Sequence, residues 1–188
     1  MTTSGYFGTV QRMEFQVPQH LSHPVDAVFV AYRDRLVELT PYLEEVESIE
    51  VVERREDGGK TYLTNRWRAK PSTVPTVVRP FMPKHALSWL DRAVWDPAAR
   101  TCAWEYELGT TPGLVRCSGI NYFRAREGGG STLEITGRLA VDLRAIHVPL
   151  IFRGAGSHVE SYLVGRVRPN LERVGPAVER WLTDQRES

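Results

Sequence analysis

One pattern repeats through the middle of the sequence, between residues 48 and 143. Runs rich in β-branched and aromatic residues alternate with short turn signals such as Asp57-Gly58-Gly59 and Gly128-Gly129-Gly130. Turns this short join antiparallel neighbours, because parallel strands need a long crossover between them. The pattern therefore predicts six strands of an antiparallel meander: Ser48–Arg55, Lys60–Ala69, Leu87–Trp95, Thr101–Leu108, Leu114–Ala125 and Thr132–Leu143.

A further strand and two helices flank this meander. Residues 13–17 alternate apolar and polar side chains and predict a first strand that ends at Pro18. Apolar residues then recur at helical spacing over residues 25–39, and again over residues 157–181, where Pro169 and Pro176 should kink or interrupt the helix.

The order of these elements predicts the fold class. A sheet of seven antiparallel strands must curl, and a terminal helix can close its concave side. We therefore expect one α+β domain over residues 1–188, with a core from about 12 to 184, in which a curved antiparallel sheet of about seven strands wraps around a long C-terminal helix.

Charge and hydropathy exclude several kinds of partner. The 188 residues carry 24 basic and 23 acidic side chains, so the overall field favours neither nucleic acid nor an anionic membrane, and we expect at most transient membrane contact. No segment has the apolar length of a membrane span or a signal peptide, which predicts a soluble, cytoplasmic protein. Arginine far outnumbers lysine, which is typical of a bacterial chain with GC-rich coding.

In a reducing cytosol Cys102 and Cys117 are expected to be buried thiols, although a disulfide between them stays open.

Aromatic residues are frequent on the predicted strands. Trp89 and Trp95 share one face by the two-residue alternation, and so do Trp104 and Tyr106. Such residues are often ordinary core, but together they can line a pocket in the concave side of the sheet. The aromatic candidates for ligand binding are Trp67, Trp89, Trp95, Trp104, Tyr106 and Tyr122.

Three polar residues alternate with aromatic side chains on these strands: Arg66, Asp91 and Asn121. Burying a polar group costs free energy unless it finds a partner, so these residues are candidates to orient the polar end of a ligand. The alternative is that the face is solvated, or that Asp91 pairs with an arginine.

The sequence contains no motif of a known catalytic chemistry. The histidines are scattered, the cysteines lack a Cys-x-x-Cys form, and there is no phosphate loop or Gly-x-Ser-x-Gly elbow. We therefore predict no metal, no cofactor and no catalytic residue. Acid–base work by Asp91, Glu105, His85 or His147 stays open, since it depends on which groups meet in space.

The element order, the segment Ser22-His23-Pro24-Val25-Asp26-Ala27-Val28-Phe29 and the terminal amphipathic helix resemble the START-like superfamily, also called Bet v 1-like or SRPBCC. The resemblance spans nearly the whole chain and implies a helix-grip fold with an internal cavity.

The central region is similar to the PRELI/MSF1 lipid-transfer group. The similarity is carried by residues 67–71, the proline-containing segment 74–78 and residues 94–102. It implies a cavity gated by an apolar lid, and the lid residues are Val74, Val77, Val78, Phe81 and Met82. Lys70, Arg79 and Lys84 beside the lid would attract an anionic headgroup or simply keep an exposed loop soluble.

Three functions fit this interpretation. The first is noncatalytic binding or transfer of a hydrophobic small molecule or lipid in an internal cavity. The second is an aromatase/cyclase-like enzyme acting on a polyketide-type substrate, which needs a buried ionisable group at the cavity. The third is a regulatory interaction module, which predicts a filled cavity and an exposed apolar patch. The sequence names no protein partner.

Overall fold

A computed structural model describes residues 11–73, 87–108, 115–142, 165 and 169–187. Seven strands form one antiparallel sheet in the order β1-β7-β6-β5-β4-β3-β2. The strands are β1 (Gln11–Leu21), β2 (Val46–Asp57), β3 (Lys60–Ala69), β4 (Ser88–Asp96), β5 (Thr101–Leu108), β6 (Val115–Ala125) and β7 (Ser131–Val141). The predicted α+β class and the curved, seven-stranded antiparallel sheet are confirmed.

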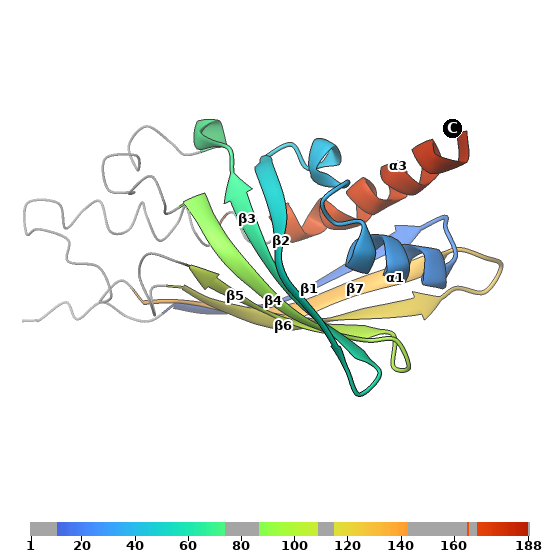
Figure 1. The fold of residues 1–188 in the computed structure, drawn as a ribbon, viewed down its shortest axis with the longest axis horizontal. Coiled ribbons are helices and arrows are strands. Elements are labelled where there is room, and N and C mark those ends of the chain that lie inside the picture. The colour runs from blue at the N-terminus through green and yellow to red at the C-terminus, as the bar shows by residue number, and fades with distance from the viewer. Residues whose placement is uncertain (1–10, 74–86, 109–114, 143–164, 166–168, 188) are drawn as a thin grey trace, which may run out of the picture.

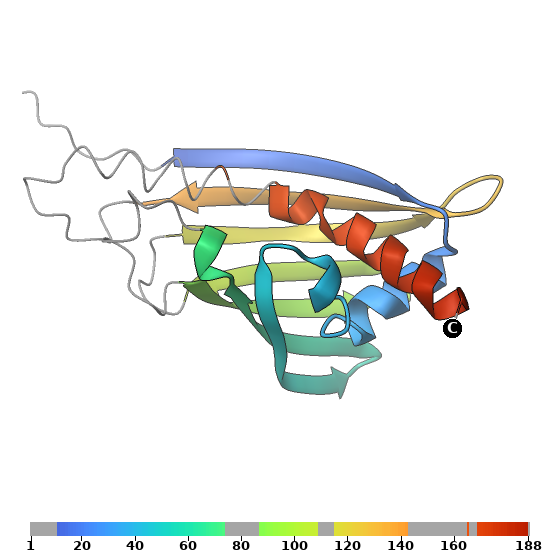
Figure 2. The same cartoon turned by 90° about the horizontal axis from the view of Figure 1, so that it is seen from above.

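Two helices lie on the concave face of the sheet (Figure 1). They are α1 (Val25–Asp34) and α3 (Val174–Glu187), and α3 runs obliquely across the strands in the view from above (Figure 2). Two short 3₁₀ turns, η1 (Thr40–Tyr42) and η2 (Pro71–Thr73), complete the described elements. None of the described helices is long and apolar enough to cross a membrane.

The core lies between the helices and the inner side of the sheet. Val28 and Phe29 of α1 and Val178 of α3 are buried there against the inward residues of the strands, such as Leu133 and Ile135. The apolar stripe of residues 25–39 extends beyond α1, which ends at Asp34. Leu36 and Leu39 nevertheless stay buried in the turns that follow it.

The predicted end of the first strand is wrong, because β1 continues through Pro18 to Leu21. β1 is an edge strand that pairs only with β7, where Pro18 lies opposite Glu134. An edge strand tolerates proline because its missing N–H can face away from the neighbouring strand.

The start of α3 shows the predicted interruption. Residues 169–172 are helical, Arg173 is a turn, and α3 begins at Val174 with Pro176 in its first turn. Proline lacks the N–H that would bond the carbonyl four residues earlier, so the helix is broken there. Gln19 of β1 bridges the break, because its amide donates to the Leu171 carbonyl (2.9 Å) and accepts from the Gly175 N–H (2.7 Å). The predicted helix start at residue 157 lies outside the described residues.

Both cysteines are buried free thiols. They do not face each other, because Cys102 lies opposite Asn121 and Cys117 lies opposite Tyr106. The structure therefore supports the expectation of buried thiols over a disulfide.

Candidate ligand-binding site

The candidate site is a row of inward side chains across the middle of the sheet. Asp91 of β4 lies directly between Asn65 of β3 and Tyr106 of β5 in the strand register. Trp67 and Trp89 face each other in the neighbouring row, nearer the end where β3 finishes and β4 begins. Alternation along each strand keeps these residues on the concave side. We call these five residues the Asp91 site.

The aromatic side chains of the concave face form two groups. In the first, Trp95 packs edge-on against Phe29 and Tyr32 of α1, with ring centroids 5.2 and 5.3 Å apart, and beside Phe123. This group is core that fixes α1 to the sheet.

The second aromatic group contains the rings of the Asp91 site. The indoles of Trp67 and Trp89 are stacked at 5.8 Å with 15° between their planes, and Trp89 contacts Tyr106 at 6.4 Å. Tyr106 then lies 4.8 Å from Trp104. These four rings form a continuous apolar surface on β3, β4 and β5.

Asp91 is the buried carboxyl group of this surface. The residue is 8% exposed, and burial raises the pKa of Asp91 to about 7. The nearby side chains of Asn65 and Trp67 oppose this rise in pKa only in part. No cation contributes to the pKa of Asp91 among the described residues. A carboxyl group with a pKa near 7 can exchange its proton at neutral pH, as general acids and bases do.

Several polar atoms of the site have no hydrogen-bond partner among the described residues. They are the acceptors Asp91 Oδ1 and Asn65 Oδ1 and the indole N–H donor of Trp89. In the same part of the chain the Trp67 indole N–H also lacks a partner within hydrogen-bond distance, although it lies near enough to Asp91 to lower the pKa of that carboxyl. Leaving such an atom buried and unpaired costs about 1–3 kcal/mol. The arrangement thus offers acceptors and donors together beside an aromatic surface, which is what the polar end of an apolar ligand requires.

Two tyrosines lie within the electrostatic influence of Asp91. Burial and the charge of Asp91 both raise the pKa of Tyr106 and of Tyr32, so both phenols are neutral. The Asn121 side-chain oxygen accepts the Trp104 indole N–H at 2.8 Å, and the Asn121 side chain partly offsets the rise in the pKa of Tyr32. Asn121 is therefore satisfied by protein groups, unlike Asn65.

The structure corrects two predicted site residues. Arg66 points to the outer face, where its side chain is 44% exposed and pairs with Glu50 at 2.9 Å. Tyr122 also lies on the outer face, where the Arg124 guanidinium stacks over its ring at 5.2 Å. Both differ by one strand position from an inward residue, and one position reverses the face.

The other predicted residues lie on the concave face. Trp67, Trp89, Asp91 and Tyr106 belong to the Asp91 site, Trp104 and Asn121 lie beside it, and Trp95 lies under α1. The predicted lid residues fall outside the described residues. Asn65 and Tyr32 were not predicted as site residues. Asn65 could have been found from its two-residue spacing to Trp67, which places both on one face of β3. Tyr32 was predicted only as part of the apolar stripe over residues 25–39.

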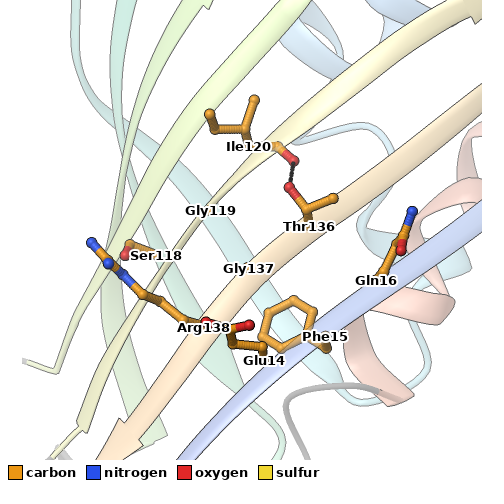
Figure 3. Close-up of a pocket in the computed structure, with 9 residues that line it drawn as sticks. All are labelled: Glu14, Phe15, Gln16, Ser118, Gly119, Ile120, Thr136, Gly137 and Arg138. Atoms are coloured by element: carbon orange, nitrogen blue, oxygen red, sulfur yellow. Dashed lines mark hydrogen bonds between the residues drawn. The ribbon is translucent and has the colours of Figure 1, made fainter.

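A separate hollow lies on the outer face of the sheet (Figure 3). It is lined by outward residues of β1, β7 and β6, including Glu14, Ile120 and Arg138, around the paired glycines Gly119 and Gly137. The inner side of these glycines is filled, because a Cβ at Gly119 would lie 2.6 Å from the Trp104 ring and a Cβ at Gly137 would lie 2.6 Å from the Phe15 ring. The hollow is thus separated from the Asp91 site by the sheet itself.

Comparison with solved structures identifies the fold. The structure resembles Zhui aromatase/cyclase from Streptomyces sp. R1128 at 19% identity and a TM-score of 0.63, over 91% of this chain and 92% of that one. It resembles Ara h 8.0201 at 18% identity and a TM-score of 0.56, over 93% and 99%. It also resembles norcoclaurine synthase from Thalictrum flavum at 12% identity and a TM-score of 0.58, over 97% and 96%. The chain has the helix-grip fold of these proteins, which is the fold that the sequence resemblance implied.

The sequence also matches one family model. Residues 16–182 match the family described as "Protein of unknown function (DUF2505)". The chain therefore belongs to this family. A comparison with curated protein sequences finds no match.

Proposed function

We propose that this protein binds a hydrophobic small molecule or lipid on the concave face of its sheet, at the Asp91 site. The observation that carries the proposal is the combination of a continuous aromatic surface with buried polar atoms that lack partners among the described residues. Three of these atoms, on Asp91, Asn65 and Trp89, lie in adjacent rows of two neighbouring strands, and such a cluster can pair with the polar end of a ligand.

Ligand burial supplies enough free energy for this function. Covering about 300 Å² of apolar ligand surface contributes roughly 7 kcal/mol before entropy costs, which is sufficient for binding in the micromolar range. The helix-grip fold shared with Zhui aromatase/cyclase and norcoclaurine synthase supports a small-molecule ligand, because the names of those proteins record action on small molecules.

A fluorescence titration with N-phenyl-1-naphthylamine tests the proposal. We expect saturable binding at one site per chain, and we expect Trp89→Ala to weaken it about tenfold, because losing a buried aromatic contact costs on the order of 1–2 kcal/mol. Tyr122→Ala is the matched control, since it removes an aromatic ring from the outer face and should leave the affinity unchanged. Circular dichroism establishes that each variant is folded. Absence of saturable binding, or equal weakening by both substitutions, would refute the proposal.

A second candidate function is an aromatase/cyclase-like enzyme. The pKa of about 7 for buried Asp91 favours it, because this carboxyl could remove and return protons during ring closure. Incubation with a linear poly-β-ketone thioester, followed by mass spectrometry, would detect cyclised products lighter by one water. Turnover that Asp91→Asn abolishes while probe binding persists would favour the enzyme over a simple binding protein.

A further inference from the structure

The charged and titratable groups around Asp91 indicate which ligand charge the site can accept. Residues facing Asp91 come from three elements: Asn65 and Trp67 from β3, Tyr106 and Cys102 from β5, and Tyr32 from α1. The two tyrosines and the cysteine have raised pKa values, so each stays neutral near pH 7. Asp91 is therefore the one group in this set that can carry a charge at neutral pH.

Cations on the surrounding strands face the other way. Arg66 and Arg68 of β3, Arg92 of β4 and Arg116 of β6 all occupy the outward positions of the alternation and are exposed. Arg66 and Arg92 are moreover paired with Glu50 and Glu107 on that outer face. The described part of the concave face around Asp91 thus contains a negative group and no positive one.

From this arrangement we infer that the site selects ligands whose buried polar group donates hydrogen bonds and carries no negative charge, such as an alcohol, a phenol or an amine, and that Asp91 is the residue that rejects carboxylates and phosphates. This inference rests on the proposed function and narrows its ligand class. A donor group on the ligand can pair with Oδ1 of Asp91 and of Asn65, and the indole N–H of Trp89, unpaired among the described residues, can donate to an uncharged acceptor such as the oxygen of the same hydroxyl group. A ligand carboxylate would instead bring a second negative charge to a buried carboxyl, which is unfavourable in a site of low dielectric constant.

Three probes with one ring system test the inference: naphthalene, 2-naphthol and 2-naphthoate. Equilibrium dialysis at pH 8, where Asp91 is mostly ionised, gives the affinity of each. We expect the wild-type protein to bind 2-naphthol at least about tenfold more tightly than 2-naphthoate, because one such hydrogen bond or charge repulsion is worth on the order of 1–2 kcal/mol. At pH 6 the discrimination should shrink, since Asp91 then holds a proton.

Two variants assign the effect to Asp91. Asp91→Asn keeps the size of the side chain and removes its charge, so 2-naphthoate should bind about tenfold more tightly than to the wild type. Glu107→Gln removes a carboxylate from the outer face of β5 and should change none of the three affinities.

The possible outcomes distinguish failure of the charge selection from failure of the proposed binding function. If naphthalene and 2-naphthol bind but 2-naphthoate binds equally well, or if Asp91→Asn leaves the preference unchanged, the charge selection is wrong and the binding function stands. If none of the three probes binds to the folded protein, the binding function fails and the inference fails with it.

Discussion

Replacing Gly119 with valine is expected to lower the free energy of unfolding by about 3 kcal/mol or more, which is at the upper end of overpacking effects. A Cβ at this position would lie 2.0 Å from the Thr136 carbonyl oxygen and 2.6 Å from the Trp104 ring. The first neighbour is backbone and the second is an indole held by Asn121, so neither can move aside without breaking the β6–β7 ladder or the Trp104–Asn121 hydrogen bond.

The measurement is urea denaturation followed by tryptophan fluorescence. Ser118→Val is the matched control, because the neighbouring side chain points to the outer face and should change the free energy of unfolding by less than about 1 kcal/mol. Equal stability of the Gly119 variant and the control would show that the Trp104 ring does not lie against this glycine.

The carboxyl group of Asp91 should make the protein less stable as the pH rises. Its pKa is about 7 in the folded state against 3.8 as its ordinary value, so between these limits the folded protein holds a proton that the unfolded chain has released. The free energy of unfolding therefore falls with rising pH, and the total loss is up to about 4 kcal/mol. The stabilising effect of the proton is complete below about pH 4 and is lost as the pH passes 7.

Asp91→Asn removes this dependence, and the comparison with wild type isolates it from other titrating groups. We expect the variant to be more stable than wild type by a few kcal/mol at pH 8 and to approach it at pH 4.5. Urea denaturation at both pH values measures the difference, and Glu107→Gln, which breaks an exposed ion pair with Arg92, should change the free energy of unfolding by less than about 1 kcal/mol. A constant difference between Asp91→Asn and wild type across this range would mean that Asp91 keeps an ordinary pKa in the folded protein.

The strands illustrate what local sequence can predict. β3 and β5 begin and end where the alternation and turn residues place them, at Lys60–Ala69 and Thr101–Leu108. Both strands are bounded by features within a few residues, such as Gly58-Gly59 before β3, and such features act without help from the rest of the chain. Pro18 shows the opposite case, because its acceptance depends on β1 lying at the edge of the sheet.

The residues of the candidate site could be predicted only in part, because the sequence does not show which face of each strand the helices cover. Alternation correctly placed Asp91 on the same face as Trp89 and Trp95, because that relation lies within one strand. It could not say which face of β3 or β6 is concave, so the predicted site contained residues of both faces. Trp67 and Asn121 lie on the inner face, whereas Arg66 and Tyr122 lie on the outer face. That choice depends on where α1 and α3 pack.

The sequence by itself determined the seven strands, their antiparallel pairing and the helix that follows them, because periodicity and turn chemistry are local properties. Only the tertiary structure decided that Asp91 is buried between Asn65 and Tyr106, with no cation beside it among the residues that the structure describes. Burial and charge pairing depend on residues from separate strands and from α1, and the curvature of the sheet brings those residues together.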